Sequence, residues 1–266
     1  MSLRATVRAL PTMAKIGFAE AVAYRAEMLV WMLSTTMPLV MLALWRAVAQ
    51  DAPVGPYDSE KFTAYYLLMF ITRQLTGAWA AWQMNYEVRT GALSQRLLRP
   101  ISPIAAYAME TLSALPVRSL VAVPMAVIAL FAVARSTLSS GPFWALLPLA
   151  LAGGWTITFL MNILIGALSL YTESSLKLME IYFTLFAVFS GYLIPVKLFP
   201  PWLRGVVEWM PFHFQVGLPV ELVTKGHEWP EALWLLGVQW GWVAVLGALT
   251  AVLWKRGLKR YAAYGG

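Results

Sequence analysis

The sequence has no cysteine, only two histidines and few charged side chains. Without cysteine, a disulfide framework and a thiolate metal site are both excluded. His213 and His227 are too few for a histidine-based metal cluster. Charged residues make up 12% of the 266 residues, whereas a soluble domain carries about 25%. The chain is instead 60% hydrophobic and contains long apolar runs, which predicts a membrane protein.

The sequence also lacks the short motifs of several enzyme classes. It has no G-x-x-x-x-G-K-[ST] phosphate loop, no H-E-x-x-H and no G-x-S-x-G. We therefore expect no catalytic residue, metal or cofactor in this chain, and any energy for transport must come from an ion gradient or a separate ATPase. Gradient-driven transport usually needs acidic or histidine side chains within spans. The sequence offers only Glu180 at the margin of one apolar run and Glu173 just outside another.

Six apolar runs predict an all-α membrane protein with six transmembrane helices. Each run approaches the roughly 20 residues that a helix needs to cross a bilayer. Residues 28–254 are predicted to form one permease domain, between an N-terminal segment (1–27) and a basic tail (255–266). The predicted spans cover residues 28–48, 62–82, 111–134, 143–170, 178–195 and 232–254.

The basic residues predict the orientation of the spans. Lys and Arg concentrate on the cytoplasmic side of membrane proteins. Twelve of them fall in segments that six spans place on the side of both termini: Arg4, Arg8, Lys15, Arg25, Arg89, Arg96, Arg99, Lys177, Lys255, Arg256, Lys259 and Arg260. Six fall on the opposite side: Arg46, Lys61, Arg135, Lys197, Arg204 and Lys225. Both termini are thus predicted to be cytoplasmic, and because topology explains the net charge of +7, no nucleic acid is expected as a partner.

Residues 1–27 are predicted to form a cytoplasmic interfacial helix. Arg4, Arg8 and Lys15 share one helical face, with Leu3, Val7 and Leu10 on a neighbouring face. Such a helix can lie along an anionic leaflet, which makes membrane lipids an expected partner. Ala47-Val48-Ala49 has the form of a signal-peptide cleavage site, but the preceding apolar run is too long for a signal core, so cleavage is not expected.

A short basic element, GALSQRLLRPISP at residues 91–103, interrupts the apolar sequence. Gly91 can end the preceding element, and Pro100 and Pro103 stop a helix. Leu93, Leu97 and Leu98 give it an apolar strip. It can be a helix that a cytosolic ATPase grips or an ordinary interfacial loop, and the residues by themselves fit both equally.

Two segments resemble the membrane subunit of ABC-2 type ABC transporters, the bacterial exporter permeases. One is the basic leucine stretch that ends at Pro100, and the other runs from Ser190 to Phe212. The resemblance implies a partly re-entrant extracellular hairpin between spans five and six, with Pro195, Phe199, Pro200, Pro201 and Pro211. It also implies that the first segment couples to the ATPase through Arg89, Gly91, Leu93, Arg96, Leu97, Leu98, Arg99 and Pro100.

The resemblance further implies partners and a location. These are a multi-pass position in the bacterial inner membrane, a second permease that is identical or related, and a cytosolic ATPase pair that binds ATP and Mg. The substrate is not implied: a drug, lipid, glycan or peptide all remain open. A gradient-driven transporter or channel, and a scaffolding subunit of an envelope assembly, are the alternatives.

The resemblance implies that spans two and five line the central interface, which makes Arg73, Gln74, Ser190 and Tyr192 pathway candidates. A cation at mid-span costs about 3 kcal/mol, so Arg73 must face protein or water. It can contact an anionic substrate or form a structural pair. We favour the structural role, because no second cation is expected on spans two or five.

Other polar and small residues inside the predicted spans have structural interpretations. Arg118 is expected to snorkel toward the cytoplasmic side or to reach Glu110. Span four carries small or amide-bearing residues that allow close helix packing, namely Gly153, Gly154, Gly166 and Asn162.

Overall fold

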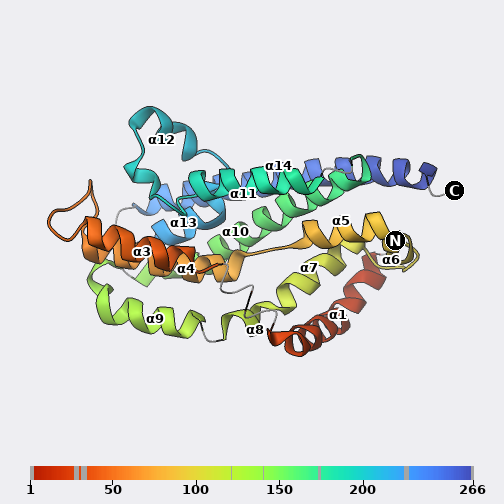
Figure 1. The fold of residues 1–266 in the computed structure, drawn as a ribbon, viewed down its shortest axis with the longest axis horizontal. Helices are drawn as coiled ribbons and strands as arrows, with labels where there is room; N and C mark the ends of the chain where they lie inside the picture. The colour runs from red at the N-terminus through yellow and green to blue at the C-terminus, as the bar shows by residue number, and fades with distance from the viewer. Residues whose placement is uncertain are drawn as a thin grey trace.

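The structure is a computed structural model that describes residues 3–26, 30, 35–120, 122–139, 141–172, 175–224 and 228–264. Its described elements are all helices, joined by loops with two isolated bridges, Val54–Tyr57 and Leu138–Thr224. The molecule is elongated, and most helices run along its long axis (Figure 1). Both chain ends and α6 lie at the right-hand end of Figure 1, and α12 lies toward the opposite end.

The two longest helices match two predicted spans in length and apolar composition. α10 (Gly141–Ala167) continues into the 3-10 turn η2 (Leu168–Leu170), and α14 runs from Trp229 to Tyr264. Among the described residues, the apolar segments 143–170 and 229–261 are each long enough to cross a bilayer. α14 extends without a break through the basic residues after Trp254, so the described part of the predicted tail is helical.

The third predicted span is broken rather than continuous. It consists of α7 (Pro103–Ser113), α8 (Leu115–Ser119) and α9 (Ala122–Val133). Pro116 lies at the start of α8 and cannot donate the backbone hydrogen bond that a continuous helix requires. The α7–α8 segment and α9 meet at 55° and together count as a third possible span.

The second predicted span, 62–82, also breaks. α4 (Ser59–Thr76) begins at Asp58, whose carboxylate accepts a hydrogen bond from the Lys61 backbone N–H at 2.8 Å. The chain is extended at Gly77, and α5 (Ala80–Thr90) starts three residues later. An uninterrupted helix through this region is therefore a wrong expectation.

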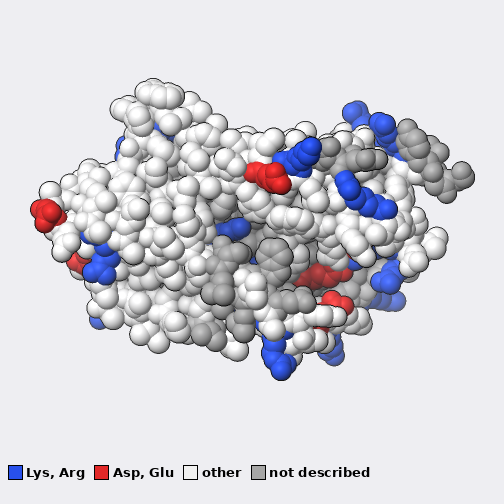
Figure 2. Space-filling model, in the orientation of Figure 1, with Lys and Arg blue, Asp and Glu red and all other residues white. Residues whose placement is uncertain are grey.

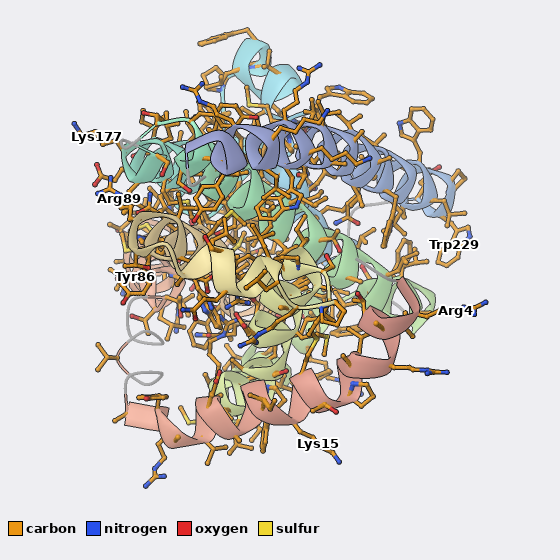
Figure 3. All side chains as sticks on the ribbon, turned by 90° about the vertical axis from the view of Figure 1, so that its right-hand side faces the viewer. Arg4, Lys15, Tyr86, Arg89, Lys177 and Trp229 are labelled. Carbon is orange, nitrogen blue, oxygen red and sulfur yellow. The ribbon has the colours of Figure 1, made fainter. Side chains whose placement is uncertain are left out.

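The remaining elements are shorter. Of the first predicted span, α3 (Met37–Val48) is described, and residues 28–29 and 31–34 lie outside the described part. The fifth corresponds to α11 (Ser175–Phe189). At the N-terminus, α1 (Leu3–Ala23) packs against α7. In Figure 3, which looks at the right-hand end of Figure 1, α1 runs across the view and Arg4 and Lys15 point away from the molecule.

After α11 the chain makes an excursion and then returns to the core. It passes through η3 (Val196–Leu198) and α12 (Pro201–Val207), then enters α13 (His213–Val223), in which every residue is buried. α13 packs against α10 and α4. A Cβ on Gly154 of α10 would lie 2.4 Å from the backbone oxygen of Gln215, so only glycine permits this approach. The predicted packing role of Gly154 is confirmed.

Aromatic side chains attach α4 to the segment that follows α11. The hydroxyls of Tyr65 and Tyr66 donate to the backbone oxygens of Gly191 and Leu193, each at 2.8 Å. Gly191 has φ of 85°, a conformation that side-chain-bearing residues rarely adopt. Many large apolar side chains elsewhere are exposed, for example Met125, Ile128 and Leu249, as expected for surfaces that face lipid.

Candidate functional site

The predicted coupling segment forms a short helix, α6 (Ala92–Leu97), at the end of the molecule where basic residues gather. Figure 2 shows most Lys and Arg atoms of that face at its right-hand end, and Figure 3 shows Arg89 and Lys177 projecting there. Gly91 separates α5 from α6 with φ of 76°, which confirms that this glycine ends the preceding helix. The element is thus a distinct helix, set off by a sharp turn.

The three leucines of the predicted apolar strip do not share one exposed face. Leu93 is fully buried in a cluster with Tyr107 and Trp254, and Leu97 packs partly against the same cluster. Leu98, which follows α6, is 87% exposed. Leu93 therefore anchors α6 to the core, and Leu98 is the apolar side chain that a partner can reach. Arg99 and Pro100 are exposed beside it.

Arg96 forms an ion-pair network inside the chain. Its guanidinium donates to Glu87 of α5 at 2.5 Å and to Glu110 of α7 at 2.9 Å. It also lies 4.4 Å from the centre of the Tyr107 ring, whose hydroxyl donates to Glu87 at 2.6 Å. Burial lowers the pKa of Arg96, but Glu110 and Glu87 outweigh it, and the net shift is upward. Arg96 is therefore engaged within the chain, and its role in coupling to an ATPase stays a prediction.

Further contacts hold α6 and the start of α7 to the two terminal helices, α14 and α1. The hydroxyls of Ser94 and Tyr261 lie 2.9 Å apart, which joins α6 to α14. The Ser102 backbone N–H donates to the Thr6 hydroxyl at 3.1 Å, which joins α7 to α1. With Arg96, these contacts tie α6 to α5, α7 and α14, and α7 to α1.

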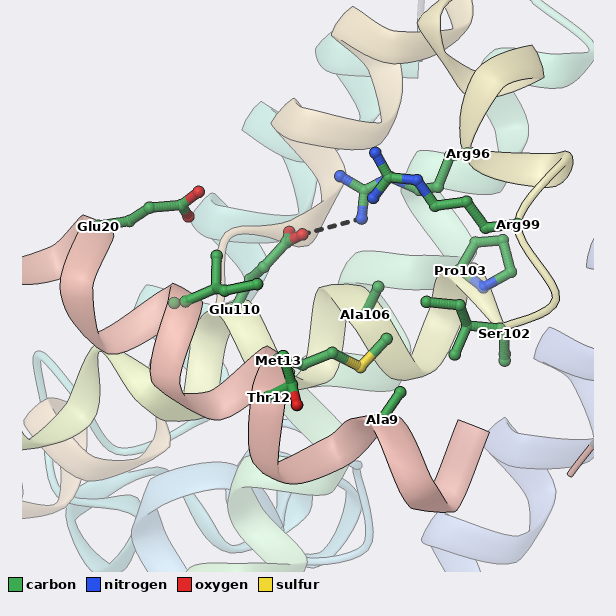
Figure 4. Close-up of a pocket in the computed structure, with 13 residues that line it drawn as sticks. Ala9, Thr12, Met13, Glu20, Arg96, Arg99, Ser102, Pro103, Ala106 and Glu110 are labelled. Carbon is green, nitrogen blue, oxygen red and sulfur yellow. Dashed lines mark hydrogen bonds and ion pairs between the residues drawn. The ribbon is translucent and has the colours of Figure 1, made fainter. Parts of the chain in front are cut away.

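A cavity of about 330 Å³ lies between α1 and the α6–α7 segment. Figure 4 shows Met13 and Glu20 of α1 on one side, with Arg96, Arg99 and Glu110 opposite. Its walls mix apolar atoms with charges of both signs, and the Arg96–Glu110 pair crosses it. It separates the N-terminal helix from the element that we expect to bind the ATPase.

A second and larger cavity, about 640 Å³, lies at the break between α4 and α5. Its lining residues come from several helices: Thr35, Arg73, Gly77, Ala78, Trp79, Trp82, Arg118, Phe183, Phe186, Ala187 and Tyr192. Figure 2 shows a hollow near the middle of the molecule with Lys or Arg atoms at its floor. Two of the predicted pathway residues, Arg73 and Tyr192, therefore meet at one cavity.

The two cations within the predicted spans, Arg73 and Arg118, lie at the same cavity. The guanidinium carbon of Arg73 lies 4.9 Å from the centre of the Phe186 ring, and that of Arg118 lies 5.2 Å from that of Trp79. Spans two and five carry no Lys or Arg in the sequence other than Arg73, but Arg118 joins it from the third predicted span. The sequence could have indicated this pairing, because Arg73 and Arg118 are the two Lys or Arg residues that lie well inside predicted spans rather than at a span end.

The expectation for Arg118 itself is wrong. It is 7% exposed and does not reach Glu110, which pairs with Arg96. Its Nη2 donates to the backbone oxygens of Gln74 and, at 3.3 Å, Gly77. These oxygens lie at the C-terminal end of α4, where backbone hydrogen bonding stops, so Arg118 supplies donors to carbonyls that the break leaves unpaired.

The other two pathway candidates do not line the cavity. Gln74 is buried and donates to the Thr35 hydroxyl at 2.8 Å. Ser190 is buried, and its hydroxyl accepts from the Tyr192 backbone N–H at 3.2 Å. Each therefore contacts a residue that lines the cavity, Thr35 or Tyr192, without lining it itself. Within the described residues no group of three or more His, Asp or Glu residues is placed to hold a metal ion.

The predicted hairpin residues surround α12. Pro200 and Pro201 are exposed at its start, where proline fits the first helical turn. Pro195 is buried, while Phe199 and Pro211 are half-buried on either side of the helix. These prolines therefore delimit a short external helix that precedes the buried α13.

A search of curated proteins found no match to this chain. A protein-family model does match: the broken second apolar run, α6, the cavity and α12–α14 all fall within residues 31–265, which fit the model described as ABC-2 family transporter protein. The chain is therefore a membrane protein that belongs to the ABC-2 transporter family.

Proposed function

We propose that this chain is the permease subunit of an ATP-driven exporter in the bacterial inner membrane. It spans the membrane six times with both termini cytoplasmic, and the segment from Ser190 to Phe212, which contains α12, forms the re-entrant extracellular hairpin. Two such permeases, identical or related, assemble with a pair of cytosolic ATPase subunits that bind ATP and Mg. This proposal fits the family, the separation of basic residues between the two ends, and a sequence without a phosphate loop.

The observation that carries the proposal is the contrast between α6 and Leu98, the residue that follows it. Leu93 holds α6 by burial, and Arg96 and Ser94 hold it by polar contacts, while Leu98 is 87% exposed at the basic end. An exposed leucine next to a firmly held helix is suited to an apolar cleft of another protein. An ordinary loop would not need ion pairs to two neighbouring helices.

In this mechanism α5 transmits the movement. It starts beside the cavity, next to Trp79, and ends at Gly91 against α6. Its 11 residues form a rod of about 16 Å. When the ATPases close on ATP, they push α6, α5 tilts relative to α4 about residues 77–79, and the cavity walls separate. Binding energy at the ATPase thereby changes the shape of a site near the middle of the membrane.

Copurification tests the proposal. The tagged chain, extracted from its native cells in a mild detergent, should bring down a protein with a phosphate loop, and the complex should hydrolyse ATP. Leu98→Asp should reduce the recovered ATPase strongly. The control Val206→Asp changes an equally apolar, 52% exposed residue on α12 and should leave recovery unchanged. Equal recovery with both variants would reject α6 as the coupling element.

A gradient-driven transporter is the second candidate because α13 contains a buried His213–Glu221 pair, 3.8 Å apart. Buried acidic and histidine side chains are the groups that proton relays use. Uptake into inverted vesicles separates the two functions. Export driven by ATP persists when an ionophore collapses the ion gradients, whereas gradient-driven transport stops.

A further inference from the structure

We propose that the cavity between Arg73 and Arg118 binds an amphiphile that has one anionic head group and an apolar body. The inference rests on the proposed export function and specifies its substrate class. The cavity lies near the middle of the molecule's long axis, and its walls come from α4, α5, α8 and α11. It lies next to the break between α4 and α5, so the proposed tilt of α5 would change the contacts of a bound molecule.

The first argument is charge. Arg73 and Arg118 line the cavity, and none of the other described residues that line it is acidic. Among the described residues, neither arginine forms a salt bridge with a carboxylate. Two cations at one mostly apolar cavity repel each other, and the buried Arg118 also loses hydration. An anion placed between them relieves both costs, which a neutral occupant cannot do.

The second argument is the unused hydrogen-bonding capacity of Arg118. Its Nη2 is occupied by the carbonyls of Gln74 and Gly77, but its Nε is buried without a partner in the described structure. A guanidinium presents its donors in a planar fork that matches carboxylate, sulfate or phosphate oxygens. The residue is 7% exposed, so bulk water does not satisfy that donor. A bound oxyanion would supply the missing acceptor.

The third argument is the apolar remainder of the wall. Trp82 and Phe183 stack with their ring centres 5.4 Å apart, and Phe186 and Tyr192 extend the aromatic surface. A free inorganic anion would leave these rings without contacts and would lose much of its hydration on entry. An apolar body attached to the anion covers them. The combination of two cations and an aromatic wall therefore favours an amphiphilic anion over either part alone.

Binding of 1-naphthyl phosphate to the purified permease–ATPase complex tests the inference. This probe combines an anionic head with an aromatic body, and 1-naphthol and inorganic phosphate supply each part separately. Titration calorimetry should show 1-naphthyl phosphate binding at least about tenfold more tightly than either part. Native mass spectrometry of the same sample shows whether an anionic membrane lipid already occupies the site or whether the ligand comes from the cytosol.

Arg73→Gln should weaken binding of 1-naphthyl phosphate by about tenfold or more, because one charge-assisted contact is lost. Arg73 holds no backbone carbonyl of the described residues, so the thermal midpoint of this variant should change little. Arg204→Gln, on exposed α12, is the matched control and should bind like the wild type. Trp82→Ala should weaken the binding of 1-naphthyl phosphate and leave the binding of inorganic phosphate unchanged.

The inference is overturned if 1-naphthol binds as tightly as 1-naphthyl phosphate, or if Arg73→Gln and Arg204→Gln bind the phosphate probe equally. Failure of this inference is distinguishable from failure of the export proposal. Absence of probe binding in a complex that retains its ATPase rejects only the substrate class. Probe binding by a chain that never associates with an ATPase rejects the export function and leaves the anion site standing.

Discussion

Arg118 on α8 donates a hydrogen bond to the backbone oxygen of Gln74 on α4, 44 residues earlier in the sequence. The same nitrogen reaches the oxygen of Gly77 at 3.3 Å. A residue of the third apolar run thus stabilises the break between α4 and α5 in the second run. Since α5 begins directly after that break, Arg118 fixes the resting position of the element that we propose as a lever.

Arg118→Lys should destabilise the protein by about 1–2 kcal/mol, because one ammonium cannot reproduce the planar set of donors that holds these carbonyls. Arg73→Lys should cost less than about 0.5 kcal/mol, since the contact with Phe186 tolerates either cation. Thermal unfolding midpoints of both variants in the same detergent check this. A larger loss for Arg73→Lys than for Arg118→Lys would contradict the assignment.

Arg96→Gln should destabilise the chain by roughly 1–3 kcal/mol, because Glu87 and Glu110 would remain partly buried without their shared cation. Arg204 and Glu208 provide a contrast, since both side chains of that pair are well exposed. Arg204→Gln should change stability by less than about 1 kcal/mol. Equal effects of the two substitutions on the thermal midpoint would show that the Arg96 network does not brace α6.

Gly154→Ala should destabilise the packing of α13 on α10, since the new Cβ would lie 2.4 Å from the Gln215 backbone oxygen. Overpacking of this kind costs typically about 1–3 kcal/mol. Gly247→Ala in α14 is the control, because no described atom outside its own helix lies within 4 Å of the Cβ that alanine would add, and helix propensity there favours alanine. Thermal midpoints that fall for Gly247→Ala but not for Gly154→Ala would overturn this account of α13.

The absence of cysteine makes the proposed topology testable with single cysteines. Gln95→Cys replaces an exposed residue of α6, and Asp51→Cys replaces an exposed residue in the loop after α3. An impermeant maleimide added to intact cells should label position 51 and not position 95, and lysis should make position 95 reactive. Labelling of position 95 in intact cells would reverse the orientation and remove α6 from the cytosol.

The sequence predicted some of these elements well and others poorly, for physical reasons. The run at 143–170 was predictable because its apolar residues are continuous and no tertiary contact interrupts it. The break at Gly77 was not, because apolar residues continue past it to Trp82 and the carbonyls there are satisfied by Arg118, a distant residue. Helical spacing placed Leu93 and Leu98 on one strip, but packing against Tyr107 and Trp254 decided which of them is buried.

The cavity was predictable only in part. Arg73 and Tyr192 were candidates because of the spans they occupy, and the structure brings them together. Gln74 and Ser190 occupy the same spans yet lie behind the wall, since side-chain direction depends on local backbone geometry that composition does not encode. Arg118 carried the same signal as Arg73, a cation inside an apolar run, and was assigned to the wrong partner because its contacts are backbone oxygens.

The central claim is that α6 passes force from an ATPase to the membrane helices. A photo-crosslinking amino acid at position 98, compared with one at position 206, tests it most directly. Illumination of intact cells should join position 98 to a protein with a phosphate loop, and position 206 should give no such product. If position 98 yields no adduct with such a protein while ATP-dependent export continues, the coupling account is contradicted.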